Sequence, residues 1–410
     1  MKKLNYYALG LIAMFAIGCD NGTDDPIVDP DPGESSSELL VKTFTAAPTM
    51  DGTVDEMWAT AQKLVTNTEV PANLGARNTY YNEDGIGEEN LDIFEGYEGE
   101  KNNFTMRSGT FGEDIYFLIE WEDADDSKDR QSWYFDPSDK LWKGEHKYAN
   151  ATDDKFYEDK IAFLFPIGDV DGFSGSTCYA SCHTVSDIAN TKDKHTRHYL
   201  KGADQKIDMW HWKRVRGTHN DKIDDQRIKS VDAPYTSSSN GRGGDPDSGN
   251  GARSGYSNNS QTLTITGTTT EVSVPKYVMP GATDVSWYSE ADIASSAKEV
   301  TAVDDQGVLT YNGGTIDPTG DAGYNQSTGN KRFPSILTRD FLGERADIDI
   351  KAVHTGTGWV AEIKRKLNTN DPWDVVFDPA VEELPFGFAI FNNAAIAHSI
   401  KPGLTLKFEE

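Results

Sequence analysis

Residues 114–123 read DIYFLIEWED, and this stretch decides the fold class. Large apolar side chains recur at every second position, at Ile115, Phe117, Ile119 and Trp121. A period of two places these four side chains on one face of a β-strand, and their size requires that this face be buried. We therefore expect residues 114–123 to form a core strand of a β-sheet.

The same alternation recurs in other parts of the chain. It appears in Ile161, Phe163 and Phe165, in Trp359, Ala361 and Ile363, and at the ends of the chain's last third, in 386–391 and 404–408. Residues 347–367 are typical of a hairpin, because Gly356 and Gly358 supply turn conformations between two alternating runs. Helical periodicity is limited to short stretches near 54–64 and 292–298. The pattern predicts an all-β protein, a β-sandwich with long loop insertions and few short helices.

Composition sets the outer limits. The chain has 410 residues, 37% of them hydrophobic and 11% aromatic, which is enough for a substantial core. It carries 39 Lys and Arg against 67 Asp and Glu, a formal charge of −28. Such a surface repels a phosphate backbone, so nucleic-acid binding is excluded, and a protein partner is expected to be basic where it docks.

The N-terminus resembles a bacterial lipoprotein signal. Lys2 and Lys3 precede an uncharged run, 6–17, that is too short to cross a bilayer of roughly 30 Å as a helix. The run ends in Ala16-Ile17-Gly18-Cys19, which is similar to a lipobox. We expect residues 1–18 to be removed and Cys19 to carry lipid; the alternative is an ordinary signal peptide with a chance cysteine. The protein would then be exported and membrane-anchored, on the periplasmic or cell-surface side of a bacterial envelope.

The expected domain organisation follows from composition. Residues 19–40 are acidic and rich in proline, which is typical of an extended tether. Residues 41–410 would form one domain, and the polar stretches 234–260 and 313–330 would be loop insertions in it.

The remaining two cysteines stand in Cys178-Tyr179-Ala180-Ser181-Cys182-His183. In c-type cytochromes two cysteines form thioethers to haem and the histidine that follows is the proximal iron ligand, usually with two residues between the cysteines. Here the spacing is three. Two alternatives remain open: a disulfide between Cys178 and Cys182, or a zinc site that would need a fourth ligand besides these cysteines and His183.

A resemblance extends along the chain. Residues 47–58 (APTMDGTVDEMW) are similar to the opening of family-nine carbohydrate-binding modules and of the haem-binding domain shared by the ethylbenzene dehydrogenase gamma subunit and certain c-type cytochromes. Further segments occur in the order that this haem family shows: 114–123, 159–165, 207–213, 345–347, 359–369, 374–377 and 386–391. The resemblance implies a β-sandwich and one haem c, attached through Cys178 and Cys182 with His183 on the iron.

The sixth iron ligand and the haem packing are expectations within this family. His398 is the favoured candidate, with His211, Met209 and Met279 as rivals; a turn histidine before the last strand is the alternative for His398. Trp210 and Trp212 are expected to pack against the haem. The carboxylates of Asp123, Asp125, Asp126 and Asp129 could bind calcium, but a solvated acidic loop is the favoured interpretation.

The function indicated is a lipid-anchored c-type cytochrome that carries single electrons, either as a free carrier or as the haem subunit of a larger oxidoreductase, for which a molybdenum enzyme is the candidate. No catalytic residues are assigned. The competing hypothesis is a carbohydrate-binding surface lipoprotein with a Cys178–Cys182 disulfide.

Overall fold

The computed structural model describes residues 33–70, 99–145, 156–176, 200, 204–230, 241–245, 254–325, 329–395 and 398–409. The chain divides into two units, Met1–Asp31 and Pro32–Glu410, and the described residues all belong to the second. In these ranges no helix has the length and apolar character needed to span a membrane.

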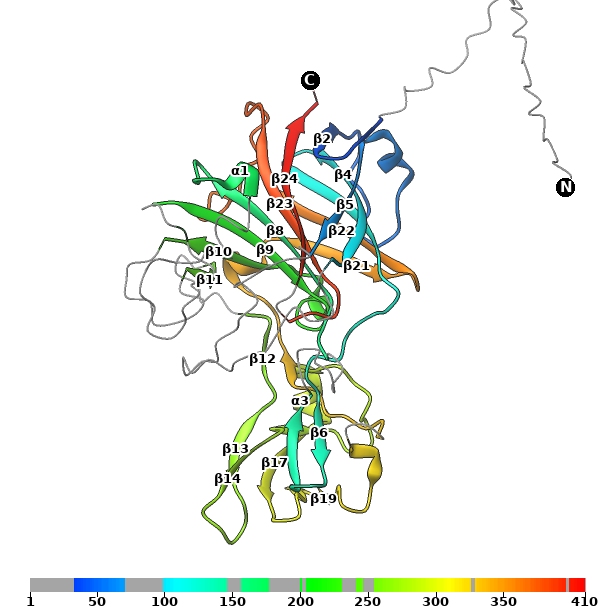
Figure 1. Cartoon of the computed structure of the whole chain (residues 1–410), viewed down its shortest axis with the longest axis vertical. Helices are drawn as coiled ribbons and strands as arrows, with labels where there is room; N and C mark the ends of the chain where they lie inside the picture. Colours follow the sequence, from blue (N-terminus) through cyan, green and yellow to red (C-terminus); the bar gives the residue numbers. More distant parts are fainter. Residues whose placement is uncertain are drawn as a thin grey trace, which may run out of the picture. The chain divides into compact units, whose positions relative to one another are not determined.

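One continuous sheet dominates the second unit (Figure 1). Its main path runs through β11 (Arg242–Gly244), β10 (Asp224–Lys229), β9 (Lys206–Lys213), β8 (Lys160–Ile167), β23 (Leu384–Phe391), β24 (Ser399–Phe408), β2 (Glu38–Thr43), β4 (Lys101–Phe111), β5 (Asp114–Glu122), β22 (Gly358–Lys366) and β21 (Asp349–His354). Off this path, β3 (Lys63–Glu69) pairs with β4, β24 and β1 (Glu34–Ser35). Most neighbours are antiparallel, but β2 runs parallel to both β24 and β4.

The two halves of this sheet pack face to face as a β-sandwich. The ring of Phe117 on β5 lies 5.9 Å from that of Phe163 on β8 and 5.8 Å from that of Trp210 on β9. Trp121, also on β5, lies 6.3 Å from Trp212. The expected all-β sandwich is therefore confirmed.

The alternation read from the sequence corresponds to the inner face of this sandwich. One hydrophobic cluster, here called the inner cluster, contains all ten of the alternating residues singled out above: Ile115, Phe117, Ile119, Trp121, Ile161, Phe163, Phe165, Trp359, Ala361 and Ile363. The hairpin expected over 347–367 is present as β21 and β22, which pair antiparallel. The short helical stretches are a 3-10 turn, η1 (Glu56–Thr60), and α3 (Glu290–Ser295), whose N-terminus has a capping box made by Ser289 and Asp292.

A further set of small sheets lies between β11 and β21 in the chain. They are β12 (Tyr256–Asn258), β20 (Ile336–Thr338) and β16 (Tyr288–Ser289); β13 (Gln261–Thr264) and β14 (Glu271–Val274); and β15 (Tyr277–Val278), β17 (Lys298–Val303), β18 (Leu309–Tyr311) and β19 (Gly314–Ile316). With the hairpin β6 (Trp133–Asp136) and β7 (Leu141–Gly144), this region has a hydrophobic cluster of its own around Trp142 and Phe333. The segments expected as insertions thus contain short strands, and 313–330 also contains the turn η4 (Ala322–Tyr324).

The layer made by β8, β9 and β10 has two different faces. On β9, Asp208, Trp210 and Trp212 alternate with Ile207, Met209 and His211, so the two sets point in opposite directions. Trp210 and Trp212 belong to the inner cluster, whereas Ile207 and Met209 belong to a second cluster, here called the outer cluster. The short elements that remain are α1 (Phe173–Ser176), η3 (Thr218–Asn220) and η5 (Gly343–Ala346).

Candidate functional site

The cysteine motif lies outside the described residues, as does Cys19 with the rest of the signal and most of the tether. The structure describes the chain on both sides of the motif, up to Ser176 at the end of α1 and again at Leu200. The position of Cys178, Cys182 and His183 can therefore be approached only through their flanks.

Both flanks of the cysteine segment are anchored in the outer cluster. Phe173 in α1 is 2% exposed and Leu200 is 2% exposed, and both belong to this cluster. The same cluster contains Ala394 and Ile400, which lie on either side of His398 in the chain. Two segments far apart in the sequence, the one with the cysteine motif and the one with His398, therefore begin and end on the same apolar surface.

Two of the candidate iron ligands meet at one aromatic ring of this surface. The His398 ring is stacked on Phe391 at a centroid distance of 4.4 Å, and the His211 ring is stacked on Phe391 at 5.6 Å. His398 is half-buried and directly precedes β24, whereas His211 is 4% exposed. The structure thus brings His211 and His398 to the same part of the sheet.

His211 differs from His398 in what holds its ring. Arg242 donates from Nη2 to Nδ1 of His211 over 2.8 Å. An arginine can only donate, so Nδ1 must accept and the ring proton must be on Nε2, where no described residue accepts it. Burial, followed by repulsion from Lys213 and Arg242, lowers the pKa of His211 well below its usual value, so the ring is neutral. In this tautomer neither ring nitrogen of His211 has a lone pair to offer a metal.

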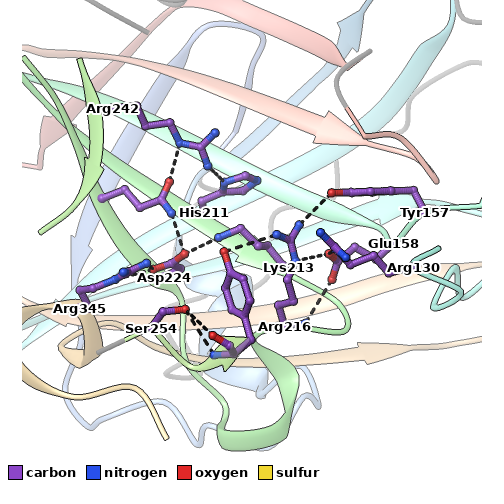
Figure 2. Close-up of polar contacts among 12 residues, drawn as sticks. Arg130, Tyr157, Glu158, His211, Lys213, Arg216, Asp224, Arg242, Ser254 and Arg345 are labelled. Carbon is purple, nitrogen blue, oxygen red and sulfur yellow. Dashed lines mark hydrogen bonds and ion pairs between the residues drawn. The ribbon is translucent and has the colours of Figure 1, made fainter. Parts of the chain in front are cut away.

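An ion-pair network continues from His211 across the same face of β9 and β10 (Figure 2). Arg242 donates from Nε to Gln226 (2.8 Å), and Gln226 in turn donates to Asp224 (2.6 Å). Asp224 is also bonded to Lys213 and to Arg345, whose Nε lies 2.9 Å from Oδ1. Burial alone would raise the pKa of Asp224, but Lys213 and Arg345 hold it below its usual value.

A second ion-pair centre lies at Glu158, next to β8. Its carboxylate accepts from Arg216 Nε at 2.5 Å and from the backbone N–H of Val215 at 2.7 Å, and Arg130 lies 3.6 Å away. Lys160, two residues further, donates to the carbonyl of Ala395 over 3.0 Å. Burial, followed by repulsion from Arg216, lowers the pKa of Lys160 well below its usual value.

Among the described residues, basic side chains outnumber carboxylates in these two centres. Six basic side chains contact or face two carboxylates: Arg130, Lys160, Lys213, Arg216, Arg242 and Arg345 against Glu158 and Asp224. Lys160 connects them to the aromatic surface, since its Nζ lies 4.1 Å from the centre of the Phe391 ring. An anionic group bound over the outer cluster near Phe391 would meet a positive potential.

The other candidate residues lie in different places. Met209 is buried in the outer cluster, on the same face as His211. Met279 follows β15 in the region of small sheets and is not part of that cluster; its backbone N–H donates to the Tyr288 hydroxyl over 3.0 Å. Trp210 and Trp212 are 0% and 1% exposed and point into the inner cluster, away from Met209 and His211.

Neither the network around Asp224 nor that around Glu158 was predicted. Their sequence signal is the presence of charged residues in strands that otherwise read as buried, such as Lys213 and Asp224. The acidic run after β5 is part of the described chain, and there Asp126 is paired with Arg214 by bonds of 2.6 and 2.9 Å. In the parts of the chain that the structure describes, the groups of carboxylates close enough to share a cation do not include this run.

The chain was compared with known families and with solved structures. The family described as ethylbenzene dehydrogenase matches residues 58–402. A solved structure of a family 9 carbohydrate binding module from Caldicellulosiruptor kristjanssonii in complex with glucose is 10% identical, with a TM-score of 0.24, over 91% of this chain and 96% of that chain. No curated protein matches the chain.

Proposed function

The chain belongs to the ethylbenzene dehydrogenase family, and from this premise we propose that it is an exported, lipid-anchored haem protein that carries single electrons. It acts as a free carrier or as the haem subunit of a larger oxidoreductase. In this proposal the cysteine motif, which lies within the matched residues 58–402, attaches one haem c.

The observation that carries the proposal is the outer cluster. It is an apolar surface on the side of β8, β9 and β23 that faces away from the sandwich core. It contains Phe173 and Leu200, which flank the segment with the cysteine motif, and Ala394 and Ile400, which lie on either side of His398 in the chain. A porphyrin needs an apolar surface of this kind next to its covalent and axial ligands, so the residues present fit the group.

Each residue then has a role. Cys178 and Cys182 would hold the haem through thioethers, and His183 and His398 would be the candidate iron ligands. The bound haem supplies one-electron chemistry. His211 stays a neutral imidazole held by Arg242, and its ring stacks on Phe391; it is not assigned as an iron ligand.

The positive potential near Phe391 has a use in this arrangement. Haem has two propionate groups, and the cations Lys160 and Arg242 lie at the edge of the outer cluster. The guanidinium of Arg242 stays charged at any ordinary pH and can donate to an anion close by. We infer that this side of the surface receives the propionates.

The redox partner and the cellular localisation are parts of the same proposal. Lipid on Cys19 holds the domain to a membrane through the acidic tether, which ends where β1 and β2 enter the sheet at Glu34 and Glu38. A formal charge of −28 favours a redox partner that is basic at its docking face. Membership of the family makes a molybdenum-containing oxidoreductase a candidate for that partner.

The decisive experiment is expression of the full chain with a cytochrome c maturation system. We expect haem that stays on the polypeptide after denaturation, one per chain, and none on the double variant Cys178→Ala, Cys182→Ala. His398→Ala should change the spectrum of the oxidised and reduced haem, whereas the matched control His354→Ala, on β21, should not. Copurification of a molybdenum protein would show that the chain is a subunit of a larger oxidoreductase and not a free electron carrier.

A colourless protein with a Cys178–Cys182 disulfide would overturn the proposal and favour the carbohydrate-binding alternative, which a glycan array tests directly. Unchanged spectra in His398→Ala would remove only the role of His398.

A further inference from the structure

Six aspartates gather beside the inner face of β9 and β10, in a group here called the acidic cluster. They come from β9, β10, the residue after β11, the end of η5 and the loop after β22: Asp208, Asp225, Asp245, Asp347, Asp371 and Asp374. Oxygen atoms of Asp208, Asp225 and Asp374 all lie within 4.8 Å of one another, and so do those of Asp245, Asp371 and Asp374. Five separate segments of the chain therefore bring carboxylates to one place.

The part of the chain that the structure describes balances the charge of the acidic cluster only in part. Asp208, Asp225, Asp245 and Asp374 are 0%, 0%, 2% and 3% exposed. Among the described residues one fully buried guanidinium, that of Arg365, contacts them, at 3.1 Å from Asp208 and 2.8 Å from Asp374. Four buried carboxylates against one buried cation leave an excess of negative charge at low dielectric, which is costly.

Several carboxylate oxygens of the acidic cluster have no hydrogen-bond donor among the described residues. Asp208 and Asp374 each use Oδ2 for Arg365 and leave Oδ1 without a hydrogen-bond partner among the described residues. Neither oxygen of Asp225 accepts a hydrogen bond from any described residue, although its side chain is completely buried. Buried polar atoms are nearly always satisfied, so the oxygens of Asp225 point to a ligand.

We propose that Asp208, Asp225 and Asp374 bind one hard divalent cation of the Ca²⁺ class, and that Asp245 and Asp371, which lie within 4.8 Å of Asp374, add negative charge beside the site. Oxygens bound to one Ca²⁺ at about 2.3–2.6 Å can be no more than about 5 Å apart, and the three carboxylates satisfy this limit. The ligands are all oxygen, which favours Ca²⁺ over zinc or copper. Two positive charges also offset most of the excess that Arg365 leaves.

The site has a structural consequence. It would tie the loop between β22 and β23 to the paired strands β9 and β10. Arg365 and the backbone N–H of Val375, 3.0 Å from Asp208 Oδ2, link the same elements. It lies on the face of β9 that Trp210 shares, opposite to Met209 and His211. The inference therefore goes beyond the electron-transfer proposal and stands or falls separately from it.

The test is a Ca²⁺ titration of the full mature chain after treatment with EDTA. We expect one Ca²⁺ per chain by calorimetry, and a higher Tm with Ca²⁺ than without it. Tb³⁺ should bind in its place and emit when tryptophan is excited, because Trp210 is the ladder partner of Asp225. Asp225→Asn should weaken Ca²⁺ binding at least about tenfold, while the exposed control Asp305→Asn should bind as the wild type does.

The variant Asp225→Asn also distinguishes two explanations of the acidic cluster: a bound metal ion, or carboxyl groups that share protons with one another. With Ca²⁺ present, Asp225→Asn should melt below the wild type; without Ca²⁺ it should melt at the same temperature or above, because one repulsive charge is gone. Absence of a Ca²⁺ heat and of a Tm shift in the wild type would overturn the proposal. If Asp225→Asn does not fold, Asp371→Asn at the half-buried edge of the cluster gives the same comparison.

Discussion

Asp224 and Asp225 are neighbours on β10, both almost fully buried, and their surroundings are opposite. Asp224 faces His211 across the ladder and bonds to Lys213, Arg345 and Gln226. Asp225 faces Trp210 and has no donor among the described residues, and burial together with Asp208 and Asp374 raises its pKa well above the usual value.

The difference follows from the geometry of a strand. Successive side chains leave a strand on opposite faces, so one peptide bond separates a face rich in cations from a face rich in carboxylates. A buried carboxylate is stable when its charge is compensated, and each face must provide this in its own way. On the outer face the protein supplies the cations; on the inner face we propose that a bound metal does.

The largest loss of stability is expected when the carboxylate of Asp224 is removed from its ion pairs on the outer face. Asp224→Asn leaves Lys213 and Arg345 buried without their anion, which should lower the free energy of unfolding by about 3–5 kcal/mol. Urea unfolding of the metal-free protein measures it, with Asp225→Asn as the matched neighbour. Equal losses in the two variants would show that both carboxylates are compensated alike and would refute the contrast between the faces.

A smaller effect on stability is expected from His211, because nearby cations on the face of Asp224 help to lower its pKa. Its folded pKa lies well below 6.5, so below pH 6.5 the unfolded chain binds a proton that the folded chain does not. Stability should therefore fall as the pH drops below 6.5, by up to about 1.4 kcal/mol per pH unit from this group. His211→Gln, which can still accept from Arg242, should have a shallower slope in unfolding experiments between pH 5 and 7. Parallel slopes would mean that His211 is not held neutral.

The smallest effect is expected at Tyr256, where the hydroxyl accepts from Arg216 over 3.4 Å. Lys213 lowers its pKa to about 8, against the opposing effect of burial. Ultraviolet difference absorbance should show a single tyrosine ionising near pH 8, absent from Tyr256→Phe. Between pH 8 and the usual value near 10 the folded chain binds fewer protons than the unfolded chain, so this group adds stability as the pH rises. A first tyrosine transition near pH 10 in the wild type would contradict the charge assigned to this face.

Much of the fold could be predicted because its signal is local. The alternation in 114–123 and the glycines of the 356–358 turn act over a few residues, and the structure confirms both as β5 and the β21–β22 hairpin. The short strands of the region between β11 and β21 could not be predicted, because strands of two to six residues are too brief to show a period.

The candidate site likewise has a part that the sequence predicts and a part that only the structure shows. The motif Cys178-Tyr179-Ala180-Ser181-Cys182-His183 and the choice of His398 stay predictions, since they rest on sequence and family. The structure adds that His398 and the flanks of the motif share one apolar surface. It adds as well that Arg242 places the ring proton of His211 on Nε2, which no spacing in the sequence shows.

By itself the sequence determined the class of fold and the buried face of each long strand, because both depend on residues close together in the chain. Only the tertiary structure decided which charges meet. Asp224 and Asp225 are two residues of the same type, adjacent on the same strand, and the local sequence does not distinguish their surroundings. Their partners come from β9, η5, β22 and the loop after it, and folding alone brings those segments together.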